Sequence, residues 1–353
     1  MFNKHLKKIN RISNYNFDRS KYLRLDRNER TIPFNKKVLN DLKKNIYNSA
    51  IQSYPMETDK LKKLISKKEK INQKYINIVP GTDAAIKYIF EIFAGKNRSI
   101  VSIYPTYGMI NIYSKVYKYK LIKVNLDKKK FNIQSFFAKK TSIIYIANPN
   151  QPSGQSIDKN NILKIITRAK KNRTYVIIDE AYIDFSEFKS ISKFVKKFKN
   201  LLVLKSLSKS FGIAGLRIGY FIAHPNFNKI LNTVRPIHDI SSFSIMAAEY
   251  FLKNVKIKNS FLQDIKKAKK YLINECLKRK LNFENTQANF FYILLPRKKI
   301  RKIHNFMFKN KILIRSNYLG AFKHYRNSIR ITVGKKEQMN RFFTIFDKIY
   351  KKI

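Results

Sequence analysis

The pattern of apolar and polar positions predicts strands that alternate with helices through the first two thirds of the chain. Short apolar runs have the length of buried strands; a helical stretch at 58–70 precedes the first of them, and others, such as 83–94, lie between them. The predicted strands are 76–79, 99–103, 121–124, 143–147, 175–178, 201–204 and 219–222. This alternation favours an α/β fold with a mostly parallel sheet covered by helices on both faces, whose ligands bind at the strand ends.

The last third of the chain follows a different pattern. After a break at Pro236, a long helical stretch covers 245–279, strand-like runs follow at 290–295, 312–315 and 329–333, and a helix at 336–350 closes the chain. This pattern predicts a smaller α+β domain. We expect residues 1–50 to form an N-terminal arm and part of this small domain, residues 51–240 the large domain, and residues 241–353 a linking helix and the rest of the small domain.

Composition narrows the classes of protein to which the chain can belong. Its 353 residues are enough for about two domains, and no apolar run approaches the roughly 18 residues of a transmembrane helix. The N-terminus is charged and has no apolar core, so we expect no secretory signal, no membrane association and a cytoplasmic protein. The single cysteine, Cys276, cannot form an internal disulfide, and the histidines show no metal-ligand spacing, so we expect no metal site.

The net charge of +53, from 75 basic and 22 acidic residues, raises the hypothesis of a nucleic-acid-binding protein. The basic residues are spread along the whole chain, however, and no stretch matches a known nucleic-acid-binding module. Isoleucine, lysine, asparagine, tyrosine and phenylalanine are all abundant, which is typical of an AT-rich coding sequence. We therefore expect no specific nucleic-acid partner, although the charge would attract phosphates and acidic substrates.

Residues 205–217, which read K-S-L-S-K-S-F-G-I-A-G-L-R, carry the strongest chemical signal. The strand-like run at 201–204 leads into a glycine-containing turn that holds Lys209. A lysine among small and apolar residues has a lowered pKa, which favours a nucleophilic amine. The hydroxyls of Ser206 and Ser208 and the guanidinium of Arg217 are groups that bind a phosphate. A lysine beside a phosphate site indicates pyridoxal phosphate; the alternative is a surface turn in a lysine-rich protein.

Two further motifs follow predicted strands. Asp179 to Tyr182 read D-E-A-Y directly after the run at 175–178, and an isolated buried carboxylate is costly unless it is compensated. The pyridinium nitrogen of a cofactor would compensate Asp179; the alternatives are a helix cap or a structural salt bridge. The run at 143–147 enters the turn N-P-N-Q-P-S-G, whose prolines and glycine hold it rigid and whose amides could face a ring hydroxyl.

These motifs, in this order, resemble those of the class I and II aminotransferases, which are pyridoxal-phosphate enzymes of fold type I, and in particular the histidinol-phosphate aminotransferases and their relatives. The resemblance extends from about Leu23 to the C-terminus and includes L-R-L-D-R-N-E at 23–29, S-Y-P at 53–55, P-G-T-D-A-A-I at 80–86 and P-T-Y at 105–107. Q-A-N-F at 287–290, I-L-I-R at 312–315 and S-I-R-I-T-V-G at 328–334 are also similar. The resemblance implies the fold type I architecture and pyridoxal 5′-phosphate as the cofactor.

The resemblance also implies a role for each matching residue around the cofactor ring. Lys209 would bind the cofactor covalently and move a proton between substrate and cofactor. Asp179 would pair with the pyridinium nitrogen and keep the ring an electron sink. Tyr182 would form a hydrogen bond with the 3′ oxygen, and Tyr107 would stack on the ring face; a core tyrosine at a strand end is the alternative for Tyr107.

Other matching residues would hold the anionic groups of cofactor and substrate. The phosphate would be bound at a helix N-terminus, where free amides and the helix dipole favour an anion, by Ser206, Ser208, Arg217 and the amides of Thr82 and Asp83. Tyr54 would reach the phosphate of the neighbouring subunit, which implies a homodimer with shared sites. Arg330, together with Arg315, would bind an acidic group of the substrate, because a bidentate guanidinium suits a carboxylate or a phosphate.

One position departs from the family pattern. The residue before P-[TS]-G is usually an asparagine that contacts the 3′ oxygen of the cofactor, and here it is Gln151. Glutamine keeps the amide and adds a methylene. Either the side chain folds back and makes the same bond, or Asn150 or Tyr182 carries more of the contact.

We therefore expect an aminotransferase that moves an amino group between a phosphorylated amine or amino acid and a 2-oxo acid. The leading pair is histidinol phosphate and 2-oxoglutarate. The alternative is a decarboxylase of a phosphorylated amino acid, of the threonine or serine phosphate type, because the same lysine and cofactor serve both reactions. The sequence leaves open which substrate bond stands perpendicular to the cofactor ring, which decides between the two reactions.

Overall fold

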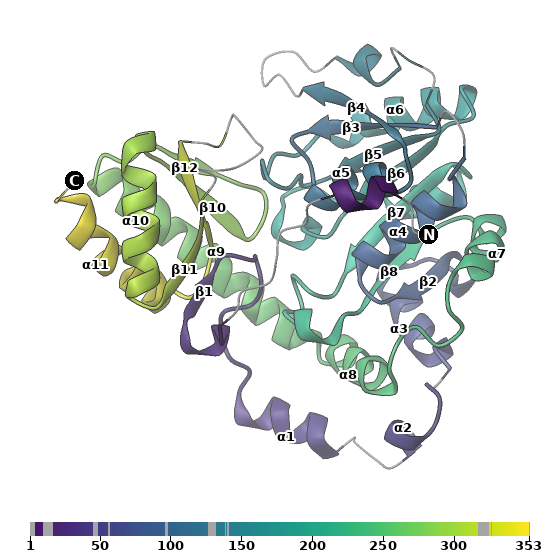
Figure 1. The fold of residues 1–353 in the computed structure, drawn as a ribbon. Coiled ribbons are helices and arrows are strands. Elements are labelled where there is room, and N and C mark those ends of the chain that lie inside the picture. Colours follow the sequence, from purple (N-terminus) through teal and green to yellow (C-terminus); the bar gives the residue numbers. More distant parts are fainter. Residues whose placement is uncertain are drawn as a thin grey trace.

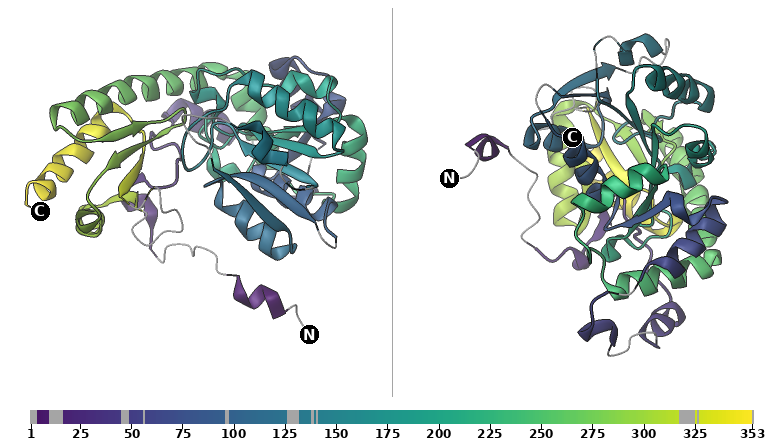
Figure 2. Two further views of the ribbon diagram at one scale, coloured as in Figure 1. Left: turned by 90° about the horizontal axis from the view of Figure 1, so that it is seen from above. Right: turned by 90° about the vertical axis from the view of Figure 1, so that its right-hand side faces the viewer.

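The computed structural model describes residues 4–9, 17–44, 49–55, 57–95, 98–125, 132–137, 139, 141–316, 325 and 327–352. Their strands form two separate sheets, of seven and of five strands (Figure 1). Helix α9 (Val255–Lys278) runs from the larger sheet towards the smaller one, as the two views in Figure 2 also show. The chain therefore has the two-sheet architecture that its apolar pattern predicts.

The seven-stranded sheet has the order β2-β8-β7-β6-β5-β3-β4. Its strands are β2 (Ile76–Val79), β3 (Ser99–Tyr104), β4 (Lys120–Asn125), β5 (Ile143–Ala147), β6 (Tyr175–Asp179), β7 (Leu201–Ser206) and β8 (Gly219–Ile222). All neighbouring pairs are parallel except the two that involve β8. Strand β5 is buried along its whole length, as expected for a parallel strand covered on both faces.

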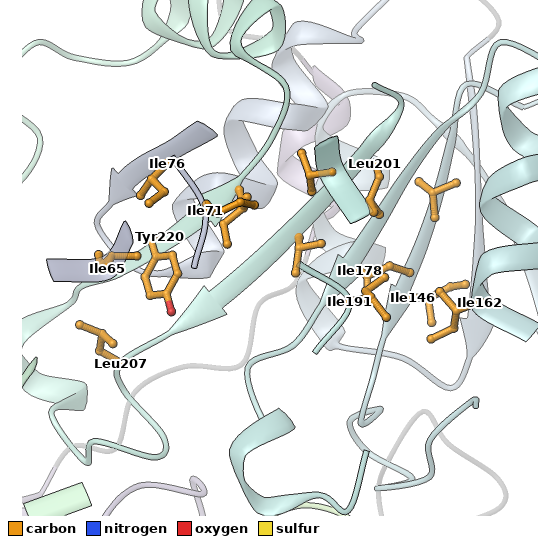
Figure 3. Close-up of a cluster of buried hydrophobic side chains, with 14 of the residues drawn as sticks. Ile65, Ile71, Ile76, Ile146, Ile162, Ile178, Ile191, Leu201, Leu207 and Tyr220 are labelled. Carbon is orange, nitrogen blue, oxygen red and sulfur yellow. The ribbon is translucent and has the colours of Figure 1, made fainter. Parts of the chain in front are cut away.

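Helices cover both faces of this sheet because successive side chains of a strand point to opposite faces. In β5, Ile144 and Ile146 belong to one apolar cluster and Ile143 and Tyr145 to another. The first cluster, part of which Figure 3 shows, contains residues of α3 (Asp59–Glu69), α6 (Lys159–Lys171) and α8 (Ser242–Lys253). The second contains residues of α4 (Thr82–Ile92), α5 (Gly108–Val116) and α7 (Pro225–Val234).

The five-stranded sheet has the order β1-β11-β12-β10-β9. Its strands are β1 (Leu23–Leu25), β9 (Phe283–Asn285), β10 (Phe290–Leu294), β11 (Ile312–Ser316) and β12 (Ser328–Thr332). Strand β1 pairs in parallel with β11, so the N-terminal segment completes a sheet built mainly from the last third of the chain. One face packs on α9, α10 (Arg297–Lys309) and α11 (Lys336–Tyr350); on the other, Phe290 and Tyr292 pack against Tyr182.

The structure differs from the predicted pattern in one long element. The predicted helix at 245–279 is two helices, α8 and α9, which meet at Asn254. Asn254 ends α8 through two bonds to the carbonyl oxygen of Tyr250, one from its backbone N–H and one from its side chain, and α9 begins with the next residue. The apolar pattern continues through this junction and does not reveal it. The division of the chain near residues 50 and 240 remains a prediction.

The helices α1 (Lys36–Lys44) and α2 (Ser49–Gln52) lie in the chain between β1 of the smaller sheet and β2 of the larger one. The parallel strands β5, β6 and β7 end at a common edge of the larger sheet, and the register of β7 with β8 places Gly219 opposite Ser206 at that edge. The motifs that follow these strands are therefore brought together in space, as is usual for parallel sheets.

Candidate active site

A cavity at this edge of the larger sheet is lined by ten of the residues that the sequence singled out. They are Thr82, Asp83, Tyr107, Gln151, Asp179, Tyr182, Ser206, Ser208, Lys209 and Arg217. They come from the ends of four strands and from the start of α4 and α5. Tyr54, Arg315 and Arg330 do not line this cavity.

Lys209 follows β7 and lies half-buried in the cavity. Its Nζ donates a hydrogen bond to the carbonyl oxygen of Arg27 at 3.3 Å, and it lies 5.7 Å from the centre of the Tyr182 ring. Burial lowers the pKa of Lys209 to about 8, and the nearby guanidinium of Arg330 acts in the same direction. Roughly a tenth of this amine is therefore neutral and nucleophilic at pH 7, far more than for an ordinary lysine.

Asp179 ends β6 and is almost fully buried. Its carboxylate accepts hydrogen bonds from the Tyr145 hydroxyl at 2.8 Å and from the Ala181 amide at 3.0 Å, and both donors are neutral. Burial nevertheless raises the pKa of Asp179 to about 6. Within the described residues Asp179 has no ion-pair partner, so a cation placed in the cavity would compensate its buried charge.

The start of α4 supplies a place for an anion. Its N-cap residue is Gly81, which offers no side-chain cap, so the first amides of the helix have no side-chain acceptor there. Gly81 has a φ of +83°, and a Cβ at this position would lie 2.8 Å from Nη2 of Arg217. Only glycine allows the Arg217 guanidinium to lie so close to the helix start. Together with Ser206 and Ser208, this arrangement suits a phosphate.

Tyr182 and Gln151 contact each other on another side of the cavity. The Tyr182 hydroxyl donates to Oε1 of Gln151 at 2.7 Å and accepts a hydrogen bond from Nδ2 of Asn28 at 3.0 Å. Nδ2 of Asn150 instead donates to the carbonyl oxygen of Pro105, which follows β3, and to Oγ of Ser153 in its own turn, both at 2.9 Å. Of the alternatives that the sequence leaves open, Asn150 is thus occupied elsewhere, and the amide of Gln151 lies in the cavity.

Tyr107 immediately precedes α5, and its side chain lines the cavity. Burial raises the pKa of its phenol well above the ordinary value, with the nearby Asp83 and Asp179 acting in the same direction. The phenol therefore stays protonated throughout the physiological range. A half-buried aromatic ring at the wall of a polar cavity is suited to stack on a planar ligand.

Arg330 lies on β12, directly opposite Arg315 on β11. Arg330 is only 8% exposed; its Nη2 donates to the carbonyl oxygen of Asp26 at 2.8 Å, and its buried Nε has no hydrogen-bond partner. It forms no ion pair with any residue that the structure describes. Two arginines at facing positions repel each other, which an anion between or beside them would relieve.

Tyr54 is a predicted site residue that lies on the surface and does not line the cavity. Its side chain is 82% exposed and stacks on His238, with ring centroids 4.8 Å apart. It therefore takes no part in the cavity of its own chain. Its assignment to the cavity of a neighbouring subunit remains a prediction.

Sequence reasoning missed two features next to the cavity. The first is the segment after β1, whose Asp26 and Arg27 carbonyl oxygens accept from Arg330 and Lys209, and whose Asn28 binds Tyr182. The motif at 23–29 marks this segment but does not reveal those contacts. The second is a buried ion-pair network next to Asp179, formed by Glu69, Glu180 and Lys205. Glu180 and Lys205 belong to two of the recognised motifs, but neither motif indicates that they pair with each other or with Glu69.

No other described region offers comparable chemistry. A larger open groove follows α6, but apart from Leu163 its lining consists of polar and basic side chains of that helix and its C-cap, with none of the motif residues. No three His, Cys, Asp or Glu side chains in the described ranges lie close enough together to hold a metal ion. The helices of the described part are also too short or too polar to span a bilayer.

Comparison with known proteins identifies the family. Residues 15–346 match the family described as aminotransferase class I and II. The chain is 30% identical over 323 residues to a histidinol-phosphate aminotransferase of Clostridium novyi, which covers 90% of this chain and 88% of that protein. The chain belongs to the class I and II aminotransferases, so the predicted family is confirmed.

Solved structures agree in fold. The histidinol-phosphate aminotransferase from Sinorhizobium meliloti in complex with pyridoxal-5′-phosphate has a TM-score of 0.84 at 18% identity and covers 93% of this chain and 91% of that one. The L-threonine-O-3-phosphate decarboxylase from Porphyromonas gingivalis has a TM-score of 0.78 at 20% identity and covers 93% of this chain and 98% of that one. The predicted fold type I architecture is thereby confirmed.

Pyridoxal 5′-phosphate is the cofactor of this family, and the cavity fits it. The uncapped start of α4 beside Arg217 matches the phosphate, and the buried Asp179, whose charge has only neutral donors, matches the pyridinium nitrogen. Lys209 provides an amine of lowered pKa for the aldehyde.

Proposed function

We propose that this chain is a pyridoxal-phosphate-dependent aminotransferase that moves an amino group between a phosphorylated amine and a 2-oxo acid. The leading pair is histidinol phosphate and 2-oxoglutarate. The observation that carries the proposal is that Lys209 and the buried Asp179 line one cavity beside an anion site. The pKa of Lys209 is lowered to about 8, and that of Asp179 is raised to about 6. The relative of Clostridium novyi supports the choice of substrate.

Each side chain of the cavity has a separate role in the proposed reaction. Bound pyridoxal phosphate supplies an electron sink for the bond that is broken next to the substrate nitrogen. Asp179 keeps a proton on the ring nitrogen, because a charged pair there relieves its buried carboxylate. Lys209 would move the proton from the substrate α-carbon to C4′ of the cofactor, for which a pKa near the working pH is suited. Ser206, Ser208 and Arg217 hold the phosphate in place.

Arg330 would bind the acidic group of the substrate, with Arg315 beside it. Its burial, its unpaired Nε and its lack of an acidic partner among the described residues support this role. It also lies close enough to lower the pKa of Lys209, so an anion bound there would be near the reacting amine. A buried guanidinium without an anionic partner is costly, and a substrate carboxylate or phosphate would remove that cost.

We further propose a cytoplasmic homodimer in which Tyr54 contacts the phosphate of the partner subunit's cofactor. Tyr54 stacks on His238, and the apolar side chains of Ile51 and Ile237, which are close to these two residues in the sequence, are also exposed; a second copy would cover them. Exposed apolar groups of this kind are frequent at protein interfaces. The proposal includes no membrane and no specific nucleic-acid partner.

The alternative function is decarboxylation of a phosphorylated amino acid. The structural likeness to the threonine phosphate decarboxylase concerns the fold, which both reactions share. A screen of phosphorylated donors with 2-oxoglutarate, with carbon dioxide measured in parallel, separates the two. We expect glutamate to form from histidinol phosphate without carbon dioxide. Release of carbon dioxide from threonine or serine phosphate, with no glutamate from any donor, would establish the alternative.

A further inference from the structure

Asn28 connects the smaller sheet to the cavity. It follows β1, is only 1% exposed and has a φ of +56°, a left-handed conformation that asparagine tolerates. Its backbone N–H donates to Oγ1 of Thr332 at 2.9 Å, and its carbonyl oxygen accepts from Nδ2 of Asn289 at 3.1 Å. Both backbone groups are thus held by residues next to strands of the smaller sheet, which leaves the side chain in a fixed position.

That side chain begins a line of hydrogen bonds that enters the cavity. Nδ2 of Asn28 donates to the Tyr182 oxygen at 3.0 Å, and the Tyr182 hydroxyl donates to Oε1 of Gln151 at 2.7 Å. An amide nitrogen only donates, and a phenol has a single proton. With Asn28 in this orientation, the hydroxyl proton of Tyr182 points to Gln151. Each hydrogen bond of the line is therefore donated towards Gln151.

The direction decides which group can donate to a ligand. The proton of Tyr182 is used by Gln151, and Oε1 of Gln151 is used by Tyr182. The N–H groups at Nε2 of Gln151 remain as donors on this side of the cavity. An asparagine at position 151 would withdraw the amide by roughly 1.5 Å, the length of one carbon–carbon bond, and would break the contact with Tyr182.

We propose that Asn28 is a positioning residue that sets this direction, so that the amide of Gln151, and not the phenol of Tyr182, donates to the 3′ oxygen of the cofactor. The proposal rests on the proposed function and on the contacts with the 3′ oxygen that the family resemblance implies for Tyr182 and for position 151. It explains why a longer amide stands at position 151: the extra methylene keeps Oε1 on Tyr182 while Nε2 stays free.

The first test compares cofactor affinity in Gln151→Leu and Tyr182→Phe. Equilibrium dialysis of cofactor-free protein against pyridoxal phosphate gives the Kd of each. We expect Gln151→Leu to weaken binding about 10-fold, the effect of one lost hydrogen bond to a charged group, and Tyr182→Phe by less than about 3-fold. The reverse ranking would show that the phenol is the donor and would overturn the proposal.

The second test addresses Asn28 itself. Asn28→Asp keeps the shape and only accepts hydrogen bonds, which reverses the line, and Asn28→Gly removes the side chain while allowing the left-handed backbone. When either Asn28 variant is present, Gln151→Leu should weaken cofactor binding by less than about 3-fold. This dependence of the Gln151→Leu effect on residue 28 should disappear when Tyr182 is also replaced by phenylalanine. A full 10-fold loss in both backgrounds would show that Asn28 does not set the direction.

A spectroscopic readout separates positioning from simple stability. The pH midpoint at which bound cofactor changes absorbance reports the hydrogen bonding of its ring oxygen, and it should move in Asn28→Asp and in Gln151→Asn but not in a variant that only lowers the unfolding temperature. An unchanged midpoint in both variants contradicts the proposal. If the unaltered protein binds no pyridoxal phosphate, the proposed function fails; if it binds and shows no coupling, only this inference fails.

Discussion

Replacing Lys205 with methionine should destabilise the protein strongly, although Lys205 touches neither cofactor nor substrate in the account above. Lys205 is buried on β7, where its Nζ lies 2.6 Å from Oε2 of Glu180 and 3.8 Å from Oε2 of Glu69. It also donates to Oγ of Ser190 at 2.8 Å. The neutral side chain would leave two buried carboxylates without their shared cation.

The size of the loss follows from the pKa of Glu69 and from the cost of broken buried pairs. Burial opposes the ionisation of Glu69, but Lys205 and Lys68 outweigh it and lower the pKa from 4.5 to about 2. At about 1.4 kcal/mol per pKa unit, that depression corresponds to roughly 3 kcal/mol. Removal of one partner from a buried ion pair costs about 3–5 kcal/mol. We therefore expect Lys205→Met to lower the free energy of unfolding by about 3–5 kcal/mol at pH 7.

Urea unfolding of the cofactor-free protein, followed by circular dichroism, measures this change. Lys63→Met is the matched control, because it removes the same charge from an exposed position of α3. A folded-state pKa below the unfolded value stabilises the protein above the unfolded pKa and loses that effect as the pH falls. The difference between Lys205→Met and the unaltered protein should thus shrink as the pH falls from 4.5 towards 2. A loss no larger than that of Lys63→Met would refute the reasoning.

Three further predictions concern the cavity. Because burial lowers the pKa of Lys209 to about 8, the rate at which cofactor-free protein binds pyridoxal phosphate covalently should rise as the pH passes through about 8. A rate midpoint near the ordinary lysine pKa of 10.5 would contradict the lowered pKa. A borohydride-fixed peptide that contains another lysine would contradict the choice of Lys209. Inactive Lys209→Ala and inactive Tyr54→Ala chains, when mixed, should recover some activity, because one hybrid site would be intact; absence of recovery in proven hybrids argues against a shared site. Arg330→Ala should weaken substrate binding by about 2–5 kcal/mol and raise KM, while the Kd for the cofactor stays unchanged. Arg330→Lys should have an intermediate effect. Loss of cofactor binding with normal substrate binding would show that Arg330 binds the cofactor and not the substrate.

The position of a strand could be predicted from the sequence where every residue of that strand is buried. The run at 143–147 is apolar because β5 is covered on both faces, so its position could be predicted to the residue. The junction at Asn254 could not be predicted, because both helices continue one apolar pattern and only the capping bonds to Tyr250 separate them. Strand β9, Phe283–Asn285, is too short for an alternating pattern and exists through its pairing with β10.

The site was predictable to the extent that its residues lie in local motifs. Lys209, Ser206, Ser208 and Arg217 stand within one turn and its flanks, so the prediction of a phosphate beside an amine could be made from that segment together with the other motifs of the chain. The contacts of Asn28 could not be predicted, because they join residues that are 154, 261 and 304 positions apart. The same holds for Lys205 and Glu69, whose pairing depends on how α3 packs on the sheet.

Nitrogen transfer tests the central claim most directly. Purified protein loaded with pyridoxal phosphate would be incubated with histidinol phosphate that carries a heavy-nitrogen label in its amino group and with 2-oxoglutarate, and the glutamate would be analysed by mass spectrometry. We expect labelled glutamate from the unaltered protein and none from Lys209→Ala. Unlabelled glutamate only, or no glutamate from a protein that demonstrably holds its cofactor on Lys209, would contradict it.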